Sequence, residues 1–265
     1  MMPVPLDLPE PSIGDLEDAP LQLVVCQIRH ERNMAIVDVK KALAIQAQLG
    51  DYDLLDEGQQ SQIDLVSTEG GGVAPSSSVT EHRGWRLRSS DRTWTAALLP
   101  DYFALECSGY TTWPAFFSRL ESLVNATTQH LGPAGLFRLG LRYIERIDLN
   151  EISEPQQWRG YINDHLLGPL LDQTMSASIT AVQQIVQFAG TKGYQVALRH
   201  GVELDDTDDT RCPYVLDTDC WWRGSRSFDV AEVLADASSL HRLALQIFEL
   251  AVTPKLLVRL KEKEG

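Results

Sequence analysis

The chain has 265 residues, of which 43% are hydrophobic and 23% charged, as expected for a folded globular protein with a substantial core. Its formal net charge of −14 argues against general binding to nucleic acid or acidic membranes, because like charges repel. No apolar run approaches the length of a membrane helix, and the N-terminus lacks the basic and apolar regions of a signal peptide. We therefore expect a cytoplasmic protein that does not enter a membrane.

Chemistry-bearing motifs are scarce. The four cysteines (Cys26, Cys107, Cys212 and Cys220) form no C-x-x-C pair, so we expect them to be reduced. The histidines form neither H-x-H nor H-E-x-x-H, and no G-x-S-x-G or phosphate-binding loop occurs. The sequence therefore predicts no metal, no cofactor and no catalytic residue. A hydrolase whose site is assembled from distant residues remains an alternative.

The first half of the chain predicts an arm followed by alternating strands and helices. Residues 1–20 carry five prolines and five acidic residues, which favours an extended arm, or alternatively a partner-binding tail. The expected strands are Leu21–His30, Gln62–Ser67, Gly84–Ser90, Thr93–Leu99 and Tyr102–Cys107, and the expected helices are Met34–Leu49 and Trp113–Leu131. Between them, the Gly/Ser-rich segment 67–83 predicts a flexible loop.

The second half predicts a similar series. The expected strands are Phe137–Asn150, Ser178–Gly190, Gly193–Leu204 and Tyr214–Trp221, and the expected helices are Glu154–Leu167, a long one from the cap Asp229 to Leu250, and a short one from Pro254. The acidic loop 205–210 lacks the ligand order of a calcium-binding loop, which favours a solvated loop.

The order of elements indicates an α+β fold. Strand, helix, three strands and helix occur twice, which predicts a tandem pseudo-repeat with antiparallel strands and helices packed on one face. Chance similarity of two α+β halves is the alternative. We expect an arm over residues 1–20, a first half over 21–133 and a second half over 134–265, packed as one compact unit.

Three arginines mark the strand Phe137–Asn150. Alternation places Phe137, Leu139, Leu141, Tyr143 and Ile147 on one side, and Arg138, Arg142 and Arg146 on the other. This stripe is a candidate binding site for an anion or a partner. The alternative is that the arginines pair with the chain's own acidic residues, such as Glu106, Glu145 or Asp217.

A second candidate is the cluster Trp221, Trp222 and Arg223 at the end of a predicted strand. Tryptophan and arginine together are frequent at protein interfaces, and tryptophan also stacks on nucleic-acid bases. The alternative is that one tryptophan belongs to the core and the other covers the start of the following helix.

Several segments resemble a sporadically distributed family of uncharacterised bacterial proteins. They are VVCQIR at 24–29, Y-x-x-W-x-x-F at 110–116, R-x-G-L-R-Y-I-x-R-I at 138–147, and the last long helix with its Leu240–His241 pair. Family members usually have Asn at the position of Glu145. Any role that depends on the side-chain amide of this asparagine is therefore in doubt for this chain. The resemblance implies no catalytic residue. The family's patchy distribution implies an accessory system such as phage defence or a toxin–antitoxin locus.

These observations favour a non-enzymatic interaction module that binds a protein partner through an α+β scaffold. A binder of nucleic acid or nucleotide that uses the arginine stripe is the alternative, and the duplicated order is reminiscent of saddle-shaped DNA-binding proteins by fold analogy. The net charge disfavours it. The sequence assigns no oligomeric state.

Overall fold

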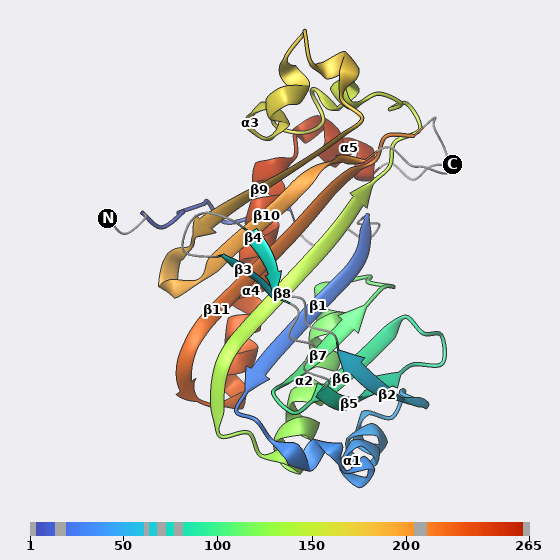
Figure 1. Ribbon diagram of the computed structural model, residues 1–265, viewed down its shortest axis with the longest axis vertical. Helices are drawn as coiled ribbons and strands as arrows, with labels where there is room; N and C mark the ends of the chain where they lie inside the picture. The colour runs from blue at the N-terminus through green and yellow to red at the C-terminus, as the bar shows by residue number, and fades with distance from the viewer. Residues whose placement is uncertain are drawn as a thin grey trace.

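One nine-stranded antiparallel sheet organises the protein, with strand order β2-β5-β6-β7-β1-β8-β11-β10-β9 (Figure 1). A separate pair, β3 and β4, forms a second small sheet. The computed structural model describes residues 4–13, 20–60, 64–67, 73–76, 82–203 and 211–261. This architecture confirms the predicted α+β class with antiparallel strands.

The strands are β1 (Leu21–His30), β2 (Leu54–Gln60), β3 (Asp64–Ser67), β4 (Val73–Ser76), β5 (His82–Arg88), β6 (Trp94–Leu99), β7 (Tyr102–Cys107), β8 (Gly135–Ile147), β9 (Ala181–Ala189), β10 (Gln195–Glu203) and β11 (Tyr214–Ser227). The α-helices are α1 (Val39–Leu49), α2 (Trp113–Leu131), α3 (Asp164–Leu167), α4 (Val230–Ala251) and α5 (Pro254–Lys261). Short 3-10 turns are η1 (Met34–Val37), η2 (Pro155–Trp158), η3 (Gly168–Leu171), η4 (Ser176–Ser178) and η5 (Thr191–Gly193).

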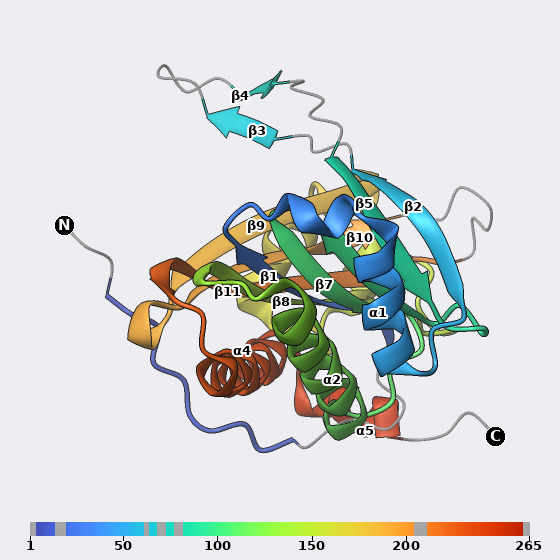
Figure 2. The ribbon, with the colours of Figure 1, turned by 90° about the horizontal axis from the view of Figure 1, so that it is seen from below.

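The two long helices, α2 and α4, pack on the same face of the sheet (Figure 2). Each has an N-terminal cap that the sequence predicts: Thr112 accepts from Ala115 N–H, and Asp229 accepts from Glu232 N–H. Their apolar stripes, including Leu120 of α2 and Leu240 of α4, are fully buried against the sheet. We call the opposite side of the sheet, which no long helix covers, the open face. It is not open throughout: β3 and β4 lie over part of it (Figures 1 and 2), and its side chains Ala97, Leu99, Tyr102 and Ala104 form a small buried cluster.

The central pair of the sheet, β1 and β8, joins the two halves of the chain. Val24 lies opposite Tyr143, and Cys26 opposite Leu141, in an antiparallel register. On one side of this pair the order is β7, β6, β5, and on the other it is β11, β10, β9. The predicted duplication stays a prediction, because the helical segments of the two halves differ: a full helix, α1, follows β1, whereas only short turns and the four-residue α3 follow β8.

Two predicted helices are wrong in detail. The segment Met34–Leu49 is broken at Asp38, whose backbone is extended and whose carboxylate caps α1 by accepting from Lys40 N–H. The segment Glu154–Leu167 is no continuous helix, because Gly160 has a φ of 87° that ends the helical path after η2. Its apolar residues are buried nonetheless, with Trp158 fully enclosed.

Three strand predictions also need correction. The sequence analysis missed β2, whose polar run DEGQQ hides the strand pattern, and β4, which interrupts the predicted loop. The predicted strand Gln62–Ser67 is present over Asp64–Ser67 as β3, and its first two residues lie outside the described ones. The last strand does not end at Trp221, because β11 continues to Ser227 along the end of β8.

The alternation of β8 is interrupted near its start. Leu136, Leu139 and Leu141 are fully buried, but Phe137 is 40% exposed instead of sharing their side. The reason is a register shift between Leu136 and Arg138 in both neighbouring pairs. In the pair with β1 the extra residue lies in β8, and in the pair with β11 it lies in β11. Beyond Arg138, the predicted alternation is correct.

The N-terminal arm lies along the body, as the extended interpretation predicts. Leu6 N–H donates to Ala189 C=O at 2.6 Å, at the end of β9. Further on, the carboxylate of Glu249 on α4 accepts from both Ser12 N–H and Ile13 N–H. Pro20 C=O then accepts from Arg146 N–H at 2.9 Å, so the described parts of the arm are held at β9, α4 and β8.

Candidate interaction face on the sheet

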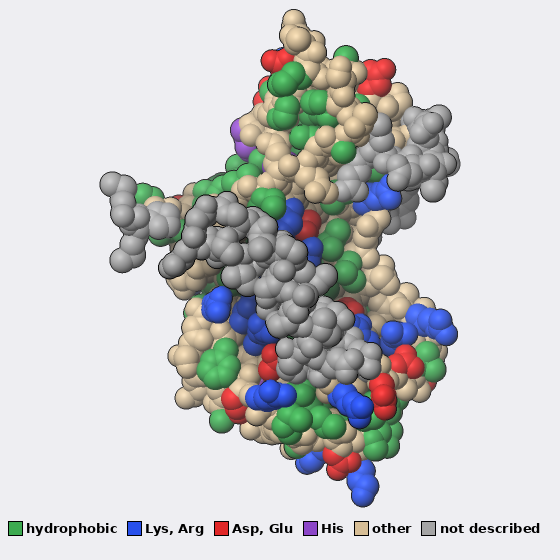
Figure 3. Space-filling model, viewed as in Figure 1, with side chains coloured by type: hydrophobic (Ala, Val, Ile, Leu, Met, Phe, Trp, Pro, Cys, Tyr) green, Lys and Arg blue, Asp and Glu red, His purple; other side chains and the backbone are tan. Residues whose placement is uncertain are grey.

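The described strand side chains of the open face include an excess of arginine. Among strand residues whose side chains the structure describes, the register places on this face Arg29, Arg86, Arg88, Arg138, Arg142, Arg146, Arg199 and Arg223, against the acidic residues Asp56, Glu106, Asp217 and Asp219. Figure 3 looks onto this face and shows basic and acidic side chains intermingled on the parts that the picture leaves visible. The face is therefore basic within an acidic chain.

Arg138 lies flat on the sheet because a glycine leaves room for it. A Cβ at Gly140 would stand 2.3 Å from the Arg138 Nη1 atom, so the guanidinium occupies the space above that glycine. From there it donates to Asp219 Oδ2 at 3.1 Å and to Gln27 Oε1 at 3.3 Å, and it lies 5.7 Å from the centre of the Trp221 ring. The R-x-G pattern of the central strand thus positions one arginine against an acid and an aromatic ring.

Arg142 forms the most closely bound ion pair of the face. Its Nε and Nη2 atoms donate to the two carboxylate oxygens of Asp217, each at 2.6 Å. These hydrogen bonds raise the pKa of Arg142 above its ordinary value. Arg199 approaches the same carboxylate at 3.6 Å, so two arginines share one acid whose side chain is 11% exposed. The group carries a net positive charge.

The alternative prediction, pairing with the chain's own acids, is therefore partly confirmed. Asp217 is a counter-charge of Arg142, as predicted, but Glu106 pairs with Arg86 instead, at 3.3 Å. Glu145 is no counter-charge, because it lies on the helix side of β8, buried opposite Leu216. Arg146 lies on the open face and is half-buried, with its backbone held by Pro20.

A row of three arginines crosses the three middle strands of the open face, near the start of β8. Arg29 of β1 lies opposite Arg138 of β8, which lies opposite Arg223 of β11. Like charges directly opposite on neighbouring strands repel and destabilise a sheet. Arg29 forms an ion pair with Asp101 at 3.2 Å, and Arg138 forms one with Asp219. Exposed Arg223 has no ion-pair partner among the described residues. The row keeps an unbalanced positive charge.

The predicted tryptophan cluster is divided by the sheet. Trp221 lies opposite Gly140 and Gln195 and faces the open side, next to Arg138. Trp222 lies on the other side, packs against the core, and stacks on Arg226 at 4.5 Å. Trp222 is thus partly buried against the core, and only Trp221 and Arg223 lie on the candidate face.

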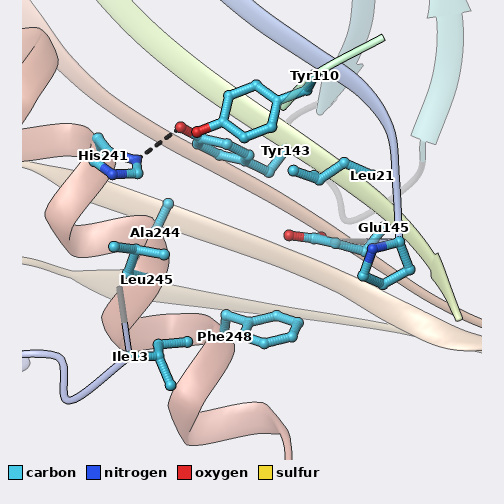
Figure 4. A pocket seen from close by; sticks show the side chains of 10 residues that line it. Ile13, Leu21, Tyr110, Tyr143, Glu145, His241, Ala244, Leu245 and Phe248 are labelled. Carbon is cyan, nitrogen blue, oxygen red and sulfur yellow. Dashed lines mark hydrogen bonds between the residues drawn. The ribbon is translucent and has the colours of Figure 1, made fainter. Parts of the chain in front are cut away.

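A second candidate region is a small cavity between β8 and α4, closed on one side by Ile13 and Pro20 of the arm (Figure 4). Glu145 points into it, and its Oε2 atom is buried without a hydrogen-bond partner among the described residues. Nearby, Tyr143 Oη and His241 Nδ1 are 2.8 Å apart, and the His241 ring stacks on Trp113 at 4.2 Å. His241 is therefore a packed, hydrogen-bonded residue, as predicted.

Burial dominates the chemistry of this cavity. It raises the pKa of Glu145 to about 8, since the charged carboxylate loses its hydration. A buried acid with a raised pKa is a recurring feature of active sites. The cavity volume, however, is only about 40 Å³, which is room for no more than a few water molecules. The cavity is too small for a substrate of ordinary size, so the open face remains the better candidate.

Other groups offer little reactivity. All four cysteines are free and buried, as predicted, and burial raises the pKa of Cys26 to about 12 and of Cys107 to about 11. Within the described ranges, no three His, Cys, Asp or Glu side chains gather as a metal site would require. The acidic loop 205–210 lies outside the described residues. No helix among the described elements is long and apolar enough to cross a membrane.

Sequence reasoning missed the residues that neighbouring strands contribute to the open face. Arg29, Arg199 and Asp219 lie far from β8 in the sequence, and only the sheet register brings them beside Arg138 and Arg142. Alternation within β1 and β10 places Arg29 and Arg199 on the side away from the core, so the sequence could have predicted the side of the sheet on which each lies. The sequence could not have predicted which residues of the neighbouring strands lie beside them.

Comparisons with known proteins assign no family or function to the chain. No family model matches the chain, and a search of curated proteins finds no significant match.

Proposed function

We propose that the protein is a non-enzymatic binding module that holds an acidic protein partner on the open face of its sheet. The observation that carries the proposal is the row Arg29–Arg138–Arg223, in which like charges lie opposite one another and one of them is unbalanced. Aligned arginines cost stability unless something offsets their repulsion. Carboxylates of a partner would do so, because arginine binds them in a two-pronged geometry.

The surroundings of the row suit a protein partner. Trp221, half-buried beside Arg138, supplies an aromatic contact of the kind frequent at binding interfaces. The net charge of −14 disfavours association with acidic proteins elsewhere on the surface, so an acidic partner would be directed to this face. A phage-defence or toxin–antitoxin setting is a hypothesis that rests on the family resemblance alone.

Charge reversal in the row tests the proposal with a defined probe, a fluorescent oligoglutamate peptide at low salt. Arg223→Glu is expected to weaken binding about tenfold, because it replaces attraction by repulsion at an exposed site. Arg159→Glu is the matched control: the same substitution at an exposed arginine off the sheet, expected to bind like the wild type. Equal affinity of all three proteins, measured by fluorescence anisotropy, would contradict the proposal.

The second candidate function is nucleic-acid binding. It is favoured by one specific observation, the contact of Trp221 with Arg138 on the open face, since aromatic rings and arginines together bind single strands by stacking and charge. It predicts a salt-dependent shift of a mixed-sequence oligonucleotide that is lost with Arg142→Glu. Circular dichroism of Arg142→Glu checks that the loss of its pair with Asp217 leaves the fold intact. Absence of any shift at low salt would exclude this function.

A further inference from the structure

The two edge strands of the nine-stranded sheet, β2 and β9, differ in how well they are protected against pairing with another chain. An edge strand exposes unpaired backbone N–H and C=O groups, and proteins usually blunt it with charge, proline or a covering segment. The edge strand β2 carries Asp56 and Glu57. The other edge strand, β9, reads AVQQIVQFA and has neither a charged residue nor a proline. Among the other strands of this sheet, only β6 (WTAALL) also lacks charge and proline, and it lies inside the sheet between β5 and β7.

The backbone groups in the middle of β9 point away from the sheet. Gly190 N–H donates to Tyr194 C=O at 2.8 Å, which fixes the alternation along the β9–β10 pair. Ala189, Ile185 and Gln187 therefore direct their backbone groups outward. The contact of Leu6 N–H with Ala189 C=O agrees with this direction and covers only the end of the strand. Among the described residues, no backbone hydrogen bond outside the strand ladder involves Ile185.

The side chains of β9 form a pattern that reads the same in both directions. On the open face they are Ala181, Gln183, Ile185, Gln187 and Ala189. Ile185 stands at the centre and is 64% exposed, the largest exposed fraction of an isoleucine or leucine in the described chain. An antiparallel second copy centred on Ile185 would set isoleucine against isoleucine and glutamine against glutamine. The pairing would stop short of Ala189, whose carbonyl accepts from Leu6 of the arm.

We propose that β9 pairs with β9 of a second copy of the chain to form a two-fold symmetric dimer. Symmetric dimers use the same patch on both subunits, which is what a pattern centred on Ile185 provides. The uncharged strand lets two acidic chains approach without charged side chains meeting at the contact. The two sheets then form one continuous sheet, and their open faces form one surface.

Cysteine cross-linking tests the proposed register. In a dimer centred on Ile185, the two copies of that residue are about 5.5 Å apart between Cα atoms, within reach of a disulfide. Ile185→Cys is therefore expected to form a covalent dimer under mild oxidation. Ala181→Cys is the matched control, exposed on the same face of the same strand, but the two copies would be about 27 Å apart. The native cysteines are buried and stay out of the reaction.

Sedimentation of the unmodified chain supplies an independent readout. The wild type is expected to show a concentration-dependent dimer, and Ile185→Lys to remain a monomer because it places like charges at the two-fold axis. Val258→Lys on α5, at a site 58% exposed, is expected to dimerise like the wild type. A wild type that stays monomeric, or equal cross-linking of Ile185→Cys and Ala181→Cys, would overturn the proposal.

Discussion

Glu145→Gln is expected to stabilise the protein by about 2–4 kcal/mol at pH 8 and to have little effect near pH 4. Burial raises the pKa of Glu145 to about 8 in the folded state, against an ordinary value of 4.5. The folded protein therefore holds a proton that the unfolded chain has released between these pH values. Wild-type stability falls as the pH rises from about 4.5 to 8, and glutamine, which does not titrate, removes that fall.

Urea denaturation at a series of pH values measures this effect. Glu121→Gln on α2 is the control, because Glu121 is exposed and its replacement is expected to leave the pH profile unchanged. Parallel pH profiles of wild type and Glu145→Gln would contradict the assignment of a protonated, buried carboxyl. The result also bears on function. A buried acid with a raised pKa is a feature of active sites, although the cavity around Glu145 is too small to indicate one by itself.

Gly201→Ala is expected to destabilise the protein by about 3 kcal/mol, at the upper end for an overpacked site. A Cβ at this position would stand 1.7 Å from the carbonyl oxygen of Val182 on the neighbouring strand, and backbone atoms cannot yield as a flexible side chain can. The pair β9–β10 must open locally to admit the methyl group. Because β9 is an edge strand, the loss is expected to concentrate there.

Hydrogen exchange shows which strands the Gly201→Ala substitution destabilises, and by how much. Amides of β9 and β10 are expected to exchange faster in Gly201→Ala, while those of β1 and β8 stay protected. Gly135→Ala in β8 is the control, since its added Cβ would make only ordinary contacts from 3.5 Å outward. Equal stability of Gly201→Ala and wild type would mean that the close approach of the two strands is not maintained in solution.

The dimer and the binding face are separable in experiment. Arg223 lies on β11, two strands away from β9, so its reversal is expected to leave dimerisation unchanged. Ile185→Lys lies on the edge strand and tests dimerisation without altering the arginine row. If oligoglutamate binding survives in the monomeric Ile185→Lys variant, one open face is sufficient for the partner.

The sequence by itself determined the class of fold and the two sides of its central strand. Alternation predicted that Leu139, Leu141 and Tyr143 are buried while Arg138 and Arg142 face away, because a strand directs successive side chains to opposite sides. Caps predicted the starts of α2 and α4, since Thr112 and Asp229 satisfy backbone N–H groups within a few residues. Such local signals act over one or two turns.

Only the tertiary structure decided which side chains meet on the open face. The row Arg29–Arg138–Arg223 depends on the register of three strands that are far apart in sequence, and a shift of one residue in either pair would have sent its members to opposite sides. The register shift beside Arg138 also exposes Phe137, against simple alternation. Likewise, the sequence shows that AVQQIVQFA is uncharged, but only the strand order makes it an edge. Pairing between distant segments follows from the packing of the whole sheet, which no local pattern contains.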